Sequence, residues 1–525
     1  MGRLYKDVQD ASQAWGKDIH PAPMGNVTTV KGDKLKHRVI QDLKANGVNS
    51  AVVLPERQVL PRGIDHALDM ARLSAHPKKK EGVSILILDF KDAFMSIPLN
   101  DKEKVYNCAT LPERISRKRE PLDPDEPVSG TCVVWNVLGF GGKPNPLVYS
   151  RVASFAMRTA QAMFPRSSTG PRVRSQLYVD DPAITARGEP DDIQLAFDLI
   201  LLWWLVLGIP LAWAKGATSE SGSKHVWIGI TYVIRRPGVV VMSLPEKYLT
   251  ELLAALEPFC QTQGRATLKE AEKMVGKASR VAHVVPAARP FVAGLWAALA
   301  ATKQDAATGR NWTKGRRVAT KRFVTAARWF RALVEGGEGT LMPLERKVLA
   351  HRPPAATMSG WVVQFDASTT GGGAVLRYGH EVYEYFAVGW SSSTAAALGV
   401  VPGLPKYQTF WEFFTLLLAL ILWADNFKNH QLAVVGDNTG ALISALQLKG
   451  KGILAAVARE VAWRRERFGW SFAVGHVPSE LNIVADALSR QHEREAPPFP
   501  QEALSEAKAR TPDLAGVESR GEMKT

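Results

Sequence analysis

The stretch Leu-Tyr-Val-Asp-Asp-Pro at residues 177–182 decides the fold of this chain, because it joins a short apolar run to two adjacent carboxylates, Asp180 and Asp181. The apolar run is typical of a buried strand. Pro182 has no N–H to donate to a neighbouring strand, so pairing is predicted to end there in a tight turn. Adjacent carboxylates at a strand tip repel each other unless a cation lies between them, and their hard oxygens suit Mg²⁺. The stretch therefore predicts a metal site.

An Asp-Asp pair alone is weak support for such a site, because most pairs of this kind lie in surface turns. The chain has a second pair, Asp191 and Asp192, whose surroundings predict a solvated helix start. The stretch SILILDFKDAF at residues 84–94 adds a third carboxylate, since its apolar run predicts a strand buried on both faces and Asp89 is the first charge after it. Two such strand ends can converge on a pair of metal ions that activates an attacking 3′ oxygen.

The combination of LDFKDAF at residues 88–94 with YVDD at residues 178–181 resembles the palm of retroelement reverse transcriptases. The resemblance implies that Asp89, Asp180 and Asp181 are the polymerase carboxylates. It also implies that Phe94 is the aromatic gate that collides with a ribose 2′-OH and so selects deoxynucleotides.

Two basic segments resemble nucleotide-binding parts of the same polymerases. Residues 36–46, KHRVIQDLKAN, predict an exposed strand, and their resemblance to the fingers makes Lys36 and Arg38 ligands of the incoming triphosphate. Residues 208–215, GIPLAWAK, predict a strand that ends in Lys215. By resemblance Lys215 lies near the triphosphate and protonates the leaving group, and a solvated strand-end lysine is the alternative interpretation.

Further segments follow in the order expected for such a polymerase. Residues 135–146, WNVLGFGGKPNP, predict a glycine-rich loop before a helix at residues 147–163, with Gly139 where the family more usually has proline, so the loop is expected to be looser. Residues 225–230 resemble the primer-grip hairpin. Residues 244–299 predict a helical thumb whose lysines face a duplex backbone.

Residues 301–355 are basic and contain interleaved aromatic side chains, and they are interpreted as a connection region. Two readings stay open, namely a charged amphipathic helix with its aromatic face in the core, and direct contact with a duplex. The basic and aromatic residues are Lys314, Arg316, Arg317, Lys321, Arg322, Arg328, Arg331, Trp312, Phe323, Trp329 and Phe330.

A second set of carboxylates lies in the last third of the chain. Asp366 and Asp437 each follow a predicted buried strand, Glu412 lies in a strongly apolar predicted helix, and Asp486 lies in a closing helix. The stretch HVPSELNIVADALSR at residues 476–490 resembles the ribonuclease H of the same retroelements.

The resemblance implies that Asp366, Glu412, Asp437 and Asp486 hold two Mg²⁺ ions that activate water against an RNA phosphodiester. It also implies that His476 assists proton transfer or product release, although a structural role is equally compatible with the sequence.

Composition favours a nucleic acid partner. The 525 residues include 66 Lys and Arg against 51 Asp and Glu, which gives a net charge of +15. A membrane surface is the rival partner for such charge. The apolar residues 199–214 are too short to span a bilayer, and no signal peptide is expected because the first residues lack an apolar core. The three widely spaced cysteines fit a reducing compartment, so a cytoplasmic or nuclear location is expected.

The predicted fold class is a multidomain α/β (α+β) chain, in which right-hand polymerase fingers, palm and thumb precede a ribonuclease H-like mixed β-sheet with helices. The predicted parts are an N-terminal arm at 1–30, fingers and palm at 31–240, thumb at 241–300, basic connection at 301–355, ribonuclease H-like domain at 356–490 and disordered tail at 491–525.

The predicted function is RNA- and DNA-directed DNA synthesis with ribonuclease H activity, in a retrotransposon protein of DIRS or gypsy type. The expected cofactor is Mg²⁺, two ions per site, with Mn²⁺ as a substitute. The expected partners are an RNA template, a DNA primer, the RNA/DNA hybrid and deoxynucleoside triphosphates, without a membrane. Three alternatives stay open: a catalytically inactive or co-opted nucleic-acid-binding protein, a cellular polymerase such as a telomerase or intron maturase, and an unrelated structural or membrane-surface protein. The sequence does not predict the oligomeric state.

Overall fold

The computed structural model describes residues 2–31, 34–111, 130–164, 171–308, 317–336, 344–350, 360–427, 431–468 and 470–514. The chain divides into two compact units, Met1–Val241 with Val348–Ala350, and Met242–Lys347 with His351–Thr525. The division after Val241 falls beside the predicted end of the fingers and palm at residue 240. The predicted C-terminal domain falls in the second unit, as do the predicted thumb from Met242 onward and the predicted connection apart from Val348–Ala350.

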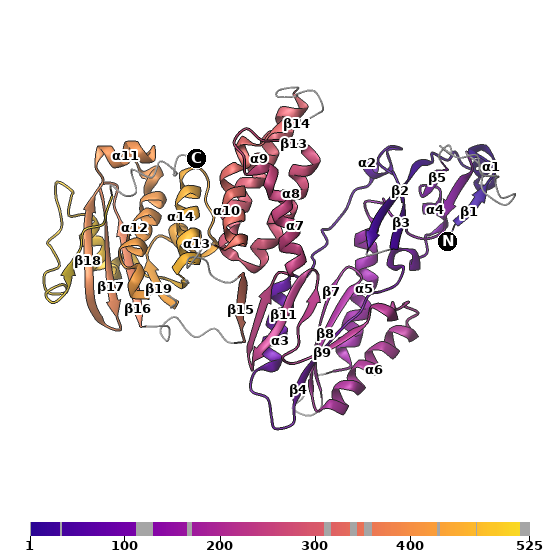
Figure 1. Cartoon of the computed structure of the whole chain (residues 1–525), viewed down its shortest axis with the longest axis horizontal. Helices are drawn as coiled ribbons and strands as arrows, with labels where there is room; N and C mark the ends of the chain where they lie inside the picture. The colour runs from indigo at the N-terminus through magenta and orange to yellow at the C-terminus, as the bar shows by residue number, and fades with distance from the viewer. Residues whose placement is uncertain are drawn as a thin grey trace. The chain divides into compact units, whose positions relative to one another are not determined.

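A four-stranded antiparallel sheet forms the centre of the first unit. Its strands, in spatial order, are β7 (Arg172–Tyr178), β8 (Asp181–Gly188), β4 (Gly82–Ile87) and β9 (Ala217–Glu220). Helices α5 (Asn145–Ala162) and α6 (Pro190–Val206) pack on the face that presents Leu86 and Ile184. Helix α3 (Gly63–Ser74) covers the other face (Figure 1). Both faces are therefore buried, as the apolar run in β4 predicts.

Strands β7 and β8 are joined by a two-residue turn, Val179-Asp180, because Tyr178 pairs with Asp181. Val179 has a φ of 59°, a value that side chains branched at Cβ rarely adopt. The prediction that pairing ends at Pro182 is wrong for β7, since Pro182 pairs with Leu177 inside β8. Towards β4 the paired register of β8 stops at Ala183, although the N–H of Leu88 still donates to the carbonyl of Pro182 at 3.3 Å.

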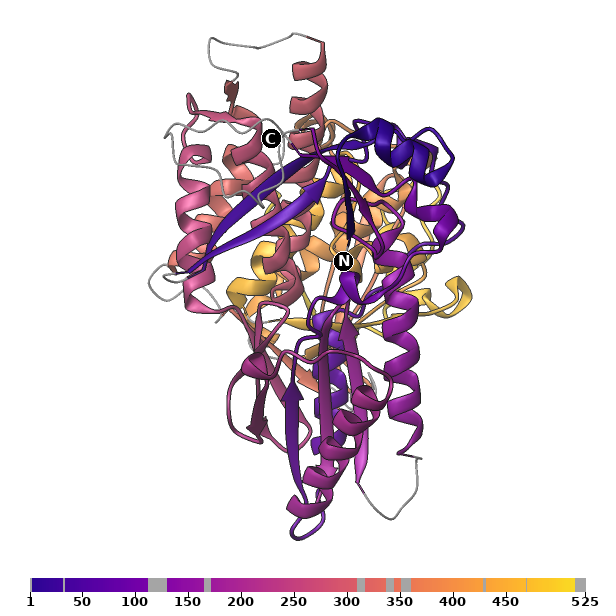
Figure 2. The same ribbon diagram turned by 90° about the vertical axis from the view of Figure 1, so that its right-hand side faces the viewer.

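A five-stranded sheet in the first unit has the strand order β1 (Gly2–Tyr5), β6 (Cys132–Trp135), β5 (Cys108–Thr110), β2 (Ala22–Lys31) and β3 (Lys34–Gln41). Figure 2 shows β2 and β3 as a long hairpin. Residues 1–30 are thus not an extended arm. They contribute β1, α1 (Val8–Trp15) and β2, and α1 begins at the N-cap Asp7 and ends at the left-handed Gly16.

Several short elements complete the first unit. Strands β10 (His225–Trp227) and β11 (Ile230–Arg236) form the hairpin predicted as the primer grip, and β12 (Val239–Ser243) and β15 (Glu345–Leu349) continue its sheet. Residues 208–215 do not form the predicted strand. A single bridge joins Phe90 to Leu211, and a 3₁₀ turn, η2 (Trp213–Lys215), follows. The other elements are α2 (Val48–Ala51), η1 (Ala93–Ser96) and α4 (Asp101–Lys104).

A helical bundle opens the second unit. It contains α7 (Glu246–Leu256), α8 (Leu268–Val284), α9 (Arg289–Ala307) and α10 (Val324–Glu335), with η3 (Glu257–Phe259), η4 (Pro286–Ala288), η5 (Lys321–Phe323) and the short pair β13 (Arg265–Thr267) and β14 (Arg317–Ala319). Helix α10, which was predicted in the connection, packs on α7 and α9. Trp329 stacks on Phe291 with ring centroids 3.8 Å apart, and Phe330 is fully buried. The aromatic face of α10 is therefore in the core, whereas Trp312, Lys314 and Arg316 lie outside the described residues.

The remainder of the second unit is built on a six-stranded mixed sheet. Its order is β20 (Ser471–His476), β19 (Gln431–Gly436), β16 (Trp361–Ala367), β17 (Gly371–Tyr378), β18 (Glu381–Gly389) and β21 (Lys508–Ala509). Strands β16, β17 and β18 are antiparallel, while β19 runs parallel to both β16 and β20. The helical elements are α11 (Ser392–Leu398), η7 (Pro405–Tyr407), α12 (Gln408–Leu422), η8 (Ala424–Phe427), α13 (Thr439–Gln447), α14 (Ile453–Phe468), η9 (Ser479–Leu481) and α15 (Ile483–Ser489).

Three consecutive glycines let helices approach both faces of β17. A Cβ on Gly371 or Gly373 would lie 2.6–2.7 Å from backbone atoms of Ser489 at the end of α15. A Cβ on Gly372 would lie 2.4 Å from the Thr415 hydroxyl of α12. Because successive residues of a strand face opposite sides, α12 and α15 cover opposite faces. Helix α12 is buried over nearly its whole length, and no helix in the described ranges is long and apolar enough to cross a bilayer.

The segment that follows α15 differs from the predicted disordered tail. Strand β21 pairs with the edge strand β18, and the backbone N–H of Arg510 donates to Tyr385. Leu504 is 4% exposed and packs with Val375 and Leu488. Residues 491–514 are thus anchored by one buried leucine and an edge pairing, which is too little apolar periodicity to be recognised in a sequence. Residues 515–525 lie outside the described residues.

Candidate active sites

The first carboxylate cluster lies at one end of the β7–β8–β4–β9 sheet. Asp89 follows β4, Asp180 lies in the β7–β8 turn and Asp181 begins β8. One carboxylate oxygen of each residue lies within 4.8 Å of the others. Asp89 is buried and the other two are partly exposed, so the cluster is open to a ligand on one side. The structure thus brings together the three side chains that the sequence predicts.

Backbone hydrogen bonds fix the two strand ends against each other. The N–H of Phe90 donates to the carbonyl of Asp180 at 2.8 Å, and the N–H of Ala212 donates to the carbonyl of Asp89 at 2.9 Å. The indole Nε1 of Trp227 donates to the carbonyl of Asp181 at 3.1 Å. The link from the β10–β11 hairpin to the carboxylate turn was not predicted, because nothing in the local sequence relates Trp227 to Asp181.

Trp227 rests in turn on a buried pair of histidines. Its ring contacts His66 with centroids 4.9 Å apart, and the Nε2 atoms of His66 and His225 are 3.1 Å apart. Burial lowers the pKa of His66 to about 3, and burial also lowers the pKa of His225 to about 4. Both imidazoles are therefore neutral at physiological pH, and they act as polar packing behind the carboxylate turn.

Phe94 lies in η1, five residues after Asp89, where it is held by two aromatic neighbours. Its ring meets Phe140 and Tyr149 edge to face, with centroids 5.7 Å and 5.4 Å apart. Burial, with the nearby charge of Asp180, raises the pKa of Tyr149 well above its usual value, so this phenol stays protonated. These two contacts fix the orientation of the Phe94 ring, and its role as a steric gate stays a prediction.

The predicted cationic residues differ in their surroundings. Lys215 forms an ion pair with Asp89, so the structure places it in the first cluster. Arg38 lies in β3, on a different sheet from the carboxylates, where it pairs with Val27. Lys36 lies in the same strand, but its side chain is outside the described part of the molecule. Contact of Lys36 and Arg38 with a triphosphate stays a prediction.

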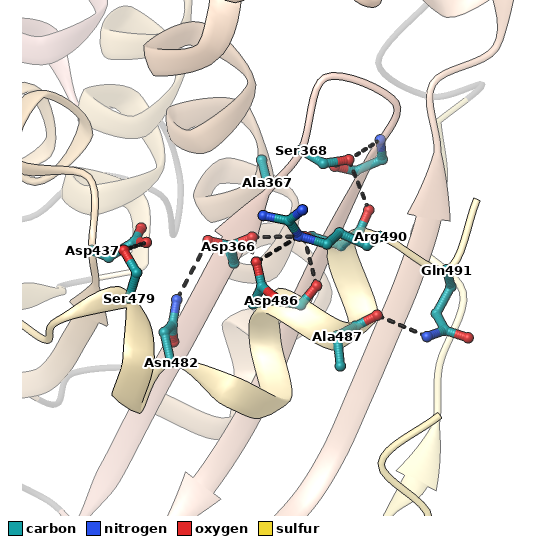
Figure 3. Close-up of polar contacts among 12 residues, drawn as sticks. Asp366, Ala367, Ser368, Asp437, Ser479, Asn482, Asp486, Ala487, Arg490 and Gln491 are labelled. Carbon is teal, nitrogen blue, oxygen red and sulfur yellow. Dashed lines mark hydrogen bonds and ion pairs between the residues drawn. The ribbon is translucent and has the colours of Figure 1, made fainter. Parts of the chain in front are cut away.

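The second cluster contains Asp366, Glu412 and Asp437, again with one oxygen of each within 4.8 Å of the others. Asp366 lies in β16, Glu412 in the first half of α12 and Asp437 directly after β19. Asp486 does not belong to this group. Arg490, four residues later, binds its Oδ1 through Nε at 2.8 Å (Figure 3).

Burial and mutual repulsion shape the second cluster. The pKa of Asp366 is raised to about 7, chiefly because burial disfavours its charge. A hydrogen bond from Ser489 opposes this shift, and the charges of Asp437 and Asp486 add to it. Burial and the charges of Asp366 and Asp437 raise the pKa of Glu412 well above its usual range. Glu412 Oε2 is buried, and no donor among the described residues reaches it. Hard oxygen ligands with an unsatisfied buried oxygen fit a divalent cation.

Several polar residues around the second cluster were not predicted as part of it. Gln408 donates to the carbonyl of Ala367 and, at 3.2 Å, to Glu412. Ser479 donates to Asp437 at 2.7 Å. His476, a predicted residue, is exposed at the end of β20 opposite Gly436, which precedes Asp437. For Ser479, its place in the stretch HVPSELNIVADALSR was the one feature of the sequence that could have predicted a position near the second cluster. No feature of the sequence predicts that position for Gln408.

Residues 28–232 match the family described as reverse transcriptase (RNA-dependent DNA polymerase). No curated protein matches the chain. The matched residues include the β7–β8–β4–β9 sheet, the first carboxylate cluster and the β2–β3 hairpin from Thr28 onward. Residues 28–232 are therefore a template-directed polymerase domain. These residues are a reverse transcriptase domain, and the predicted relationship to retroelement reverse transcriptases is confirmed for this part of the chain.

Proposed function

We propose that the chain is an RNA- and DNA-directed DNA polymerase fused to a ribonuclease H. The observation that carries the proposal is the presence of two separate carboxylate clusters on two different sheets, each with its oxygens within 4.8 Å of one another. The proposed parts are fingers and palm at 31–240, thumb at 241–300 and a ribonuclease H-like domain from residue 356. The retroelement subtype, DIRS or gypsy, is part of the proposal and rests on the sequence alone.

At the first cluster, Asp89, Asp180 and Asp181 would hold two Mg²⁺ ions. Such ions favour an attacking 3′ oxygen and a leaving pyrophosphate in an in-line phosphoryl transfer. Lys215 pairs with Asp89, which supports the proposal that its ammonium group donates a proton to the leaving group. The fixed ring of Phe94 would exclude a ribose 2′-OH, and Lys36 and Arg38 would neutralise the triphosphate.

At the second cluster, Asp366, Glu412 and Asp437, joined by Asp486, would hold the ions that favour attack of water on an RNA phosphodiester. The antiparallel β16–β17–β18 followed by the parallel β19 and β20 supports a ribonuclease H-like sheet. His476 ends β20 beside Asp437 and is proposed to carry a proton to or from the site.

The test is extension of a DNA primer on an RNA template with Mg²⁺ and deoxynucleotides, with both product length and template length measured. Asp180→Asn/Asp181→Asn is expected to abolish synthesis and keep template cleavage. Asp437→Asn is expected to abolish cleavage and keep synthesis, since the two clusters share no residue.

Matched controls are available in the same chain. Asp191→Asn/Asp192→Asn changes the other Asp-Asp pair, at the start of α6, and Asp425→Asn changes an exposed carboxylate of η8. Both controls should keep both activities. A wild-type chain that binds the hybrid but neither extends nor cuts it would contradict the proposal and favour an inactive nucleic-acid-binding protein.

A further inference from the structure

A buried network of polar side chains surrounds the Asp366 carboxylate. Ser489 and Asn482 are fully buried, and Gln364 and Asp366 are 8% and 5% exposed. Gln364 and Asp366 lie two residues apart in β16, so their side chains leave the same face of the sheet. Ser489 ends α15, while Asn482 precedes its first residue, so the two ends of one helix flank the carboxylate. Figure 3 shows Asn482 next to Asp366.

Both oxygens of Asp366 have a neighbour in this network. Ser489 Oγ donates to Oδ2 at 2.6 Å, and Asn482 Nδ2 lies 3.5 Å from Oδ1. Asn482 is itself oriented, because its Oδ1 accepts from Gln364 Nε2 at 2.7 Å and its Nδ2 donates to the carbonyl of Phe365 at 3.2 Å. The amide of Asn482 therefore cannot turn without losing two buried hydrogen bonds.

A purely structural role is the competing interpretation for Ser489, since its hydroxyl also lies 2.9 Å from the carbonyl of Asp486. A hydroxyl has one proton and can donate it once. The carboxylate of Asp366 is the stronger acceptor and the nearer one, at 2.6 Å. The proton therefore goes to Asp366. The close approach that makes this contact possible depends on Gly371 and Gly373, which leave room for the end of α15.

We propose that Ser489, supported by Asn482, is a positioning residue that holds the Asp366 carboxylate so that its remaining lone pairs face Glu412 and Asp437. This inference rests on the proposed ribonuclease H function. It assigns a role to Ser489 and Asn482, which are not among the proposed metal ligands. Outer partners of this kind orient a ligand before the ion arrives, and their loss typically costs 10- to 100-fold in metal affinity or activity.

The experiment measures Mn²⁺ binding to the full chain without nucleic acid, from the electron paramagnetic resonance signal of free Mn²⁺ at one fixed pH. Asp180→Asn/Asp181→Asn is present throughout, so that the first cluster does not contribute. Ser489→Ala is expected to weaken Mn²⁺ binding roughly tenfold. Ser368→Ala is the matched control, because the Ser368 hydroxyl is buried and bonds the carbonyl of Ser489 at 3.0 Å but touches no carboxylate.

Hybrid cleavage supplies the second readout. Ser489→Ala should lower kcat while leaving KM for the hybrid unchanged, and a higher Mg²⁺ concentration should restore the rate. Ser489→Ala that binds Mn²⁺ as tightly as Ser368→Ala would overturn the inference. If Ser489→Ala does not fold, Ser489→Cys keeps the volume with a weaker donor, and wild-type Mn²⁺ affinity in that variant would overturn the inference equally.

The outcomes separate this inference from the proposed function. A wild-type chain that does not cut a hybrid, yet loses Mn²⁺ affinity in Ser489→Ala, contradicts the ribonuclease H function and supports the positioning role. A wild-type chain that cuts the hybrid, with Ser489→Ala unchanged in Mn²⁺ affinity and kcat, supports the function and contradicts the positioning role.

Discussion

Asp366 shows how one buried carboxylate couples a metal site to pH. In the folded chain its pKa is about 7, against an ordinary value of 3.8, because burial disfavours the charge. Between these two values the folded state without metal keeps a proton that the unfolded state has lost. The stability of the metal-free protein is therefore expected to fall as pH rises from about 4 to about 7.

Divalent metal should reverse this effect, because a bound cation favours the ionised carboxylate. The increase in unfolding temperature on adding Mg²⁺, relative to EDTA, is expected to be larger at pH 8 than at pH 6. Thermal unfolding at both pH values measures it, and Asp366→Asn should reduce the pH dependence of the increase, while Glu412, whose pKa is also raised, supplies the dependence that remains. An equal increase at both pH values in the wild type would contradict the assigned origin of the shift.

The carboxylates of the two clusters could be predicted from the sequence, because few residue types supply the oxygen ligands that a divalent cation requires. The three carboxylates of the first cluster, and Asp366, Glu412 and Asp437 of the second, lie together as the sequence indicates. Asp486 was predicted to lie with them, but its carboxylate lies outside this group of three and pairs with Arg490. The roles of Ser489, Gln408 and Trp227 could not be predicted, because each depends on contacts between segments far apart in the chain.

At the scale of elements, the segment after α15 carries a testable consequence. Strand β21 covers the edge of β18, and Leu504 is buried beneath it. Ending the chain after Arg490 should cost about 2 kcal/mol for the exposed leucine alone and leave an unpaired strand edge. The truncated protein is expected to unfold at a lower temperature and to aggregate more, as measured by calorimetry and light scattering.

A chain that ends after Leu514 is the matched control, since it removes only residues outside the described part of the structure. It should behave like the full chain. If both truncations behave alike, the edge pairing contributes nothing measurable to stability.

Elements with strong periodicity were predictable, whereas those that depend on a few contacts were not. Helix α5 begins within two residues of its predicted start, because its apolar spacing and preceding glycines are clear. The prediction of an N-terminal arm was wrong, because α1 is only eight residues long and its buried residue, Ala11, is small. The predicted strand at residues 208–215 was also wrong. The 3₁₀ turn at its end, Trp213–Lys215, has only three residues, which is too few for a sequence pattern to distinguish it from a strand.

At the scale of the whole molecule, the net charge of +15 predicts salt-dependent binding to nucleic acid. Lys269 and Lys273 are exposed on α8 and should each neutralise about one phosphate. In Lys269→Gln/Lys273→Gln, the slope of the logarithm of affinity against the logarithm of salt concentration should fall by about two. Fluorescence anisotropy with a labelled hybrid measures it.

The matched control keeps the charges and changes the side chains. Lys269→Arg/Lys273→Arg should retain the wild-type slope. A slope that stays unchanged in the glutamine variant would show that α8 does not face the phosphate backbone.

The turn between β7 and β8 has a consequence for protein engineering. Val179 holds a left-handed backbone that glycine adopts without strain, at a cost of about 1–3 kcal/mol. The restricted backbone of Val179 also limits the movement of the neighbouring carboxylates, Asp180 and Asp181. Laboratory evolution for heat resistance alone would therefore select glycine at position 179. The same change would make the carboxylate geometry less rigid, and the proposed DNA synthesis depends on that geometry. Stability and catalytic rate are thus expected to change in opposite directions at this one position.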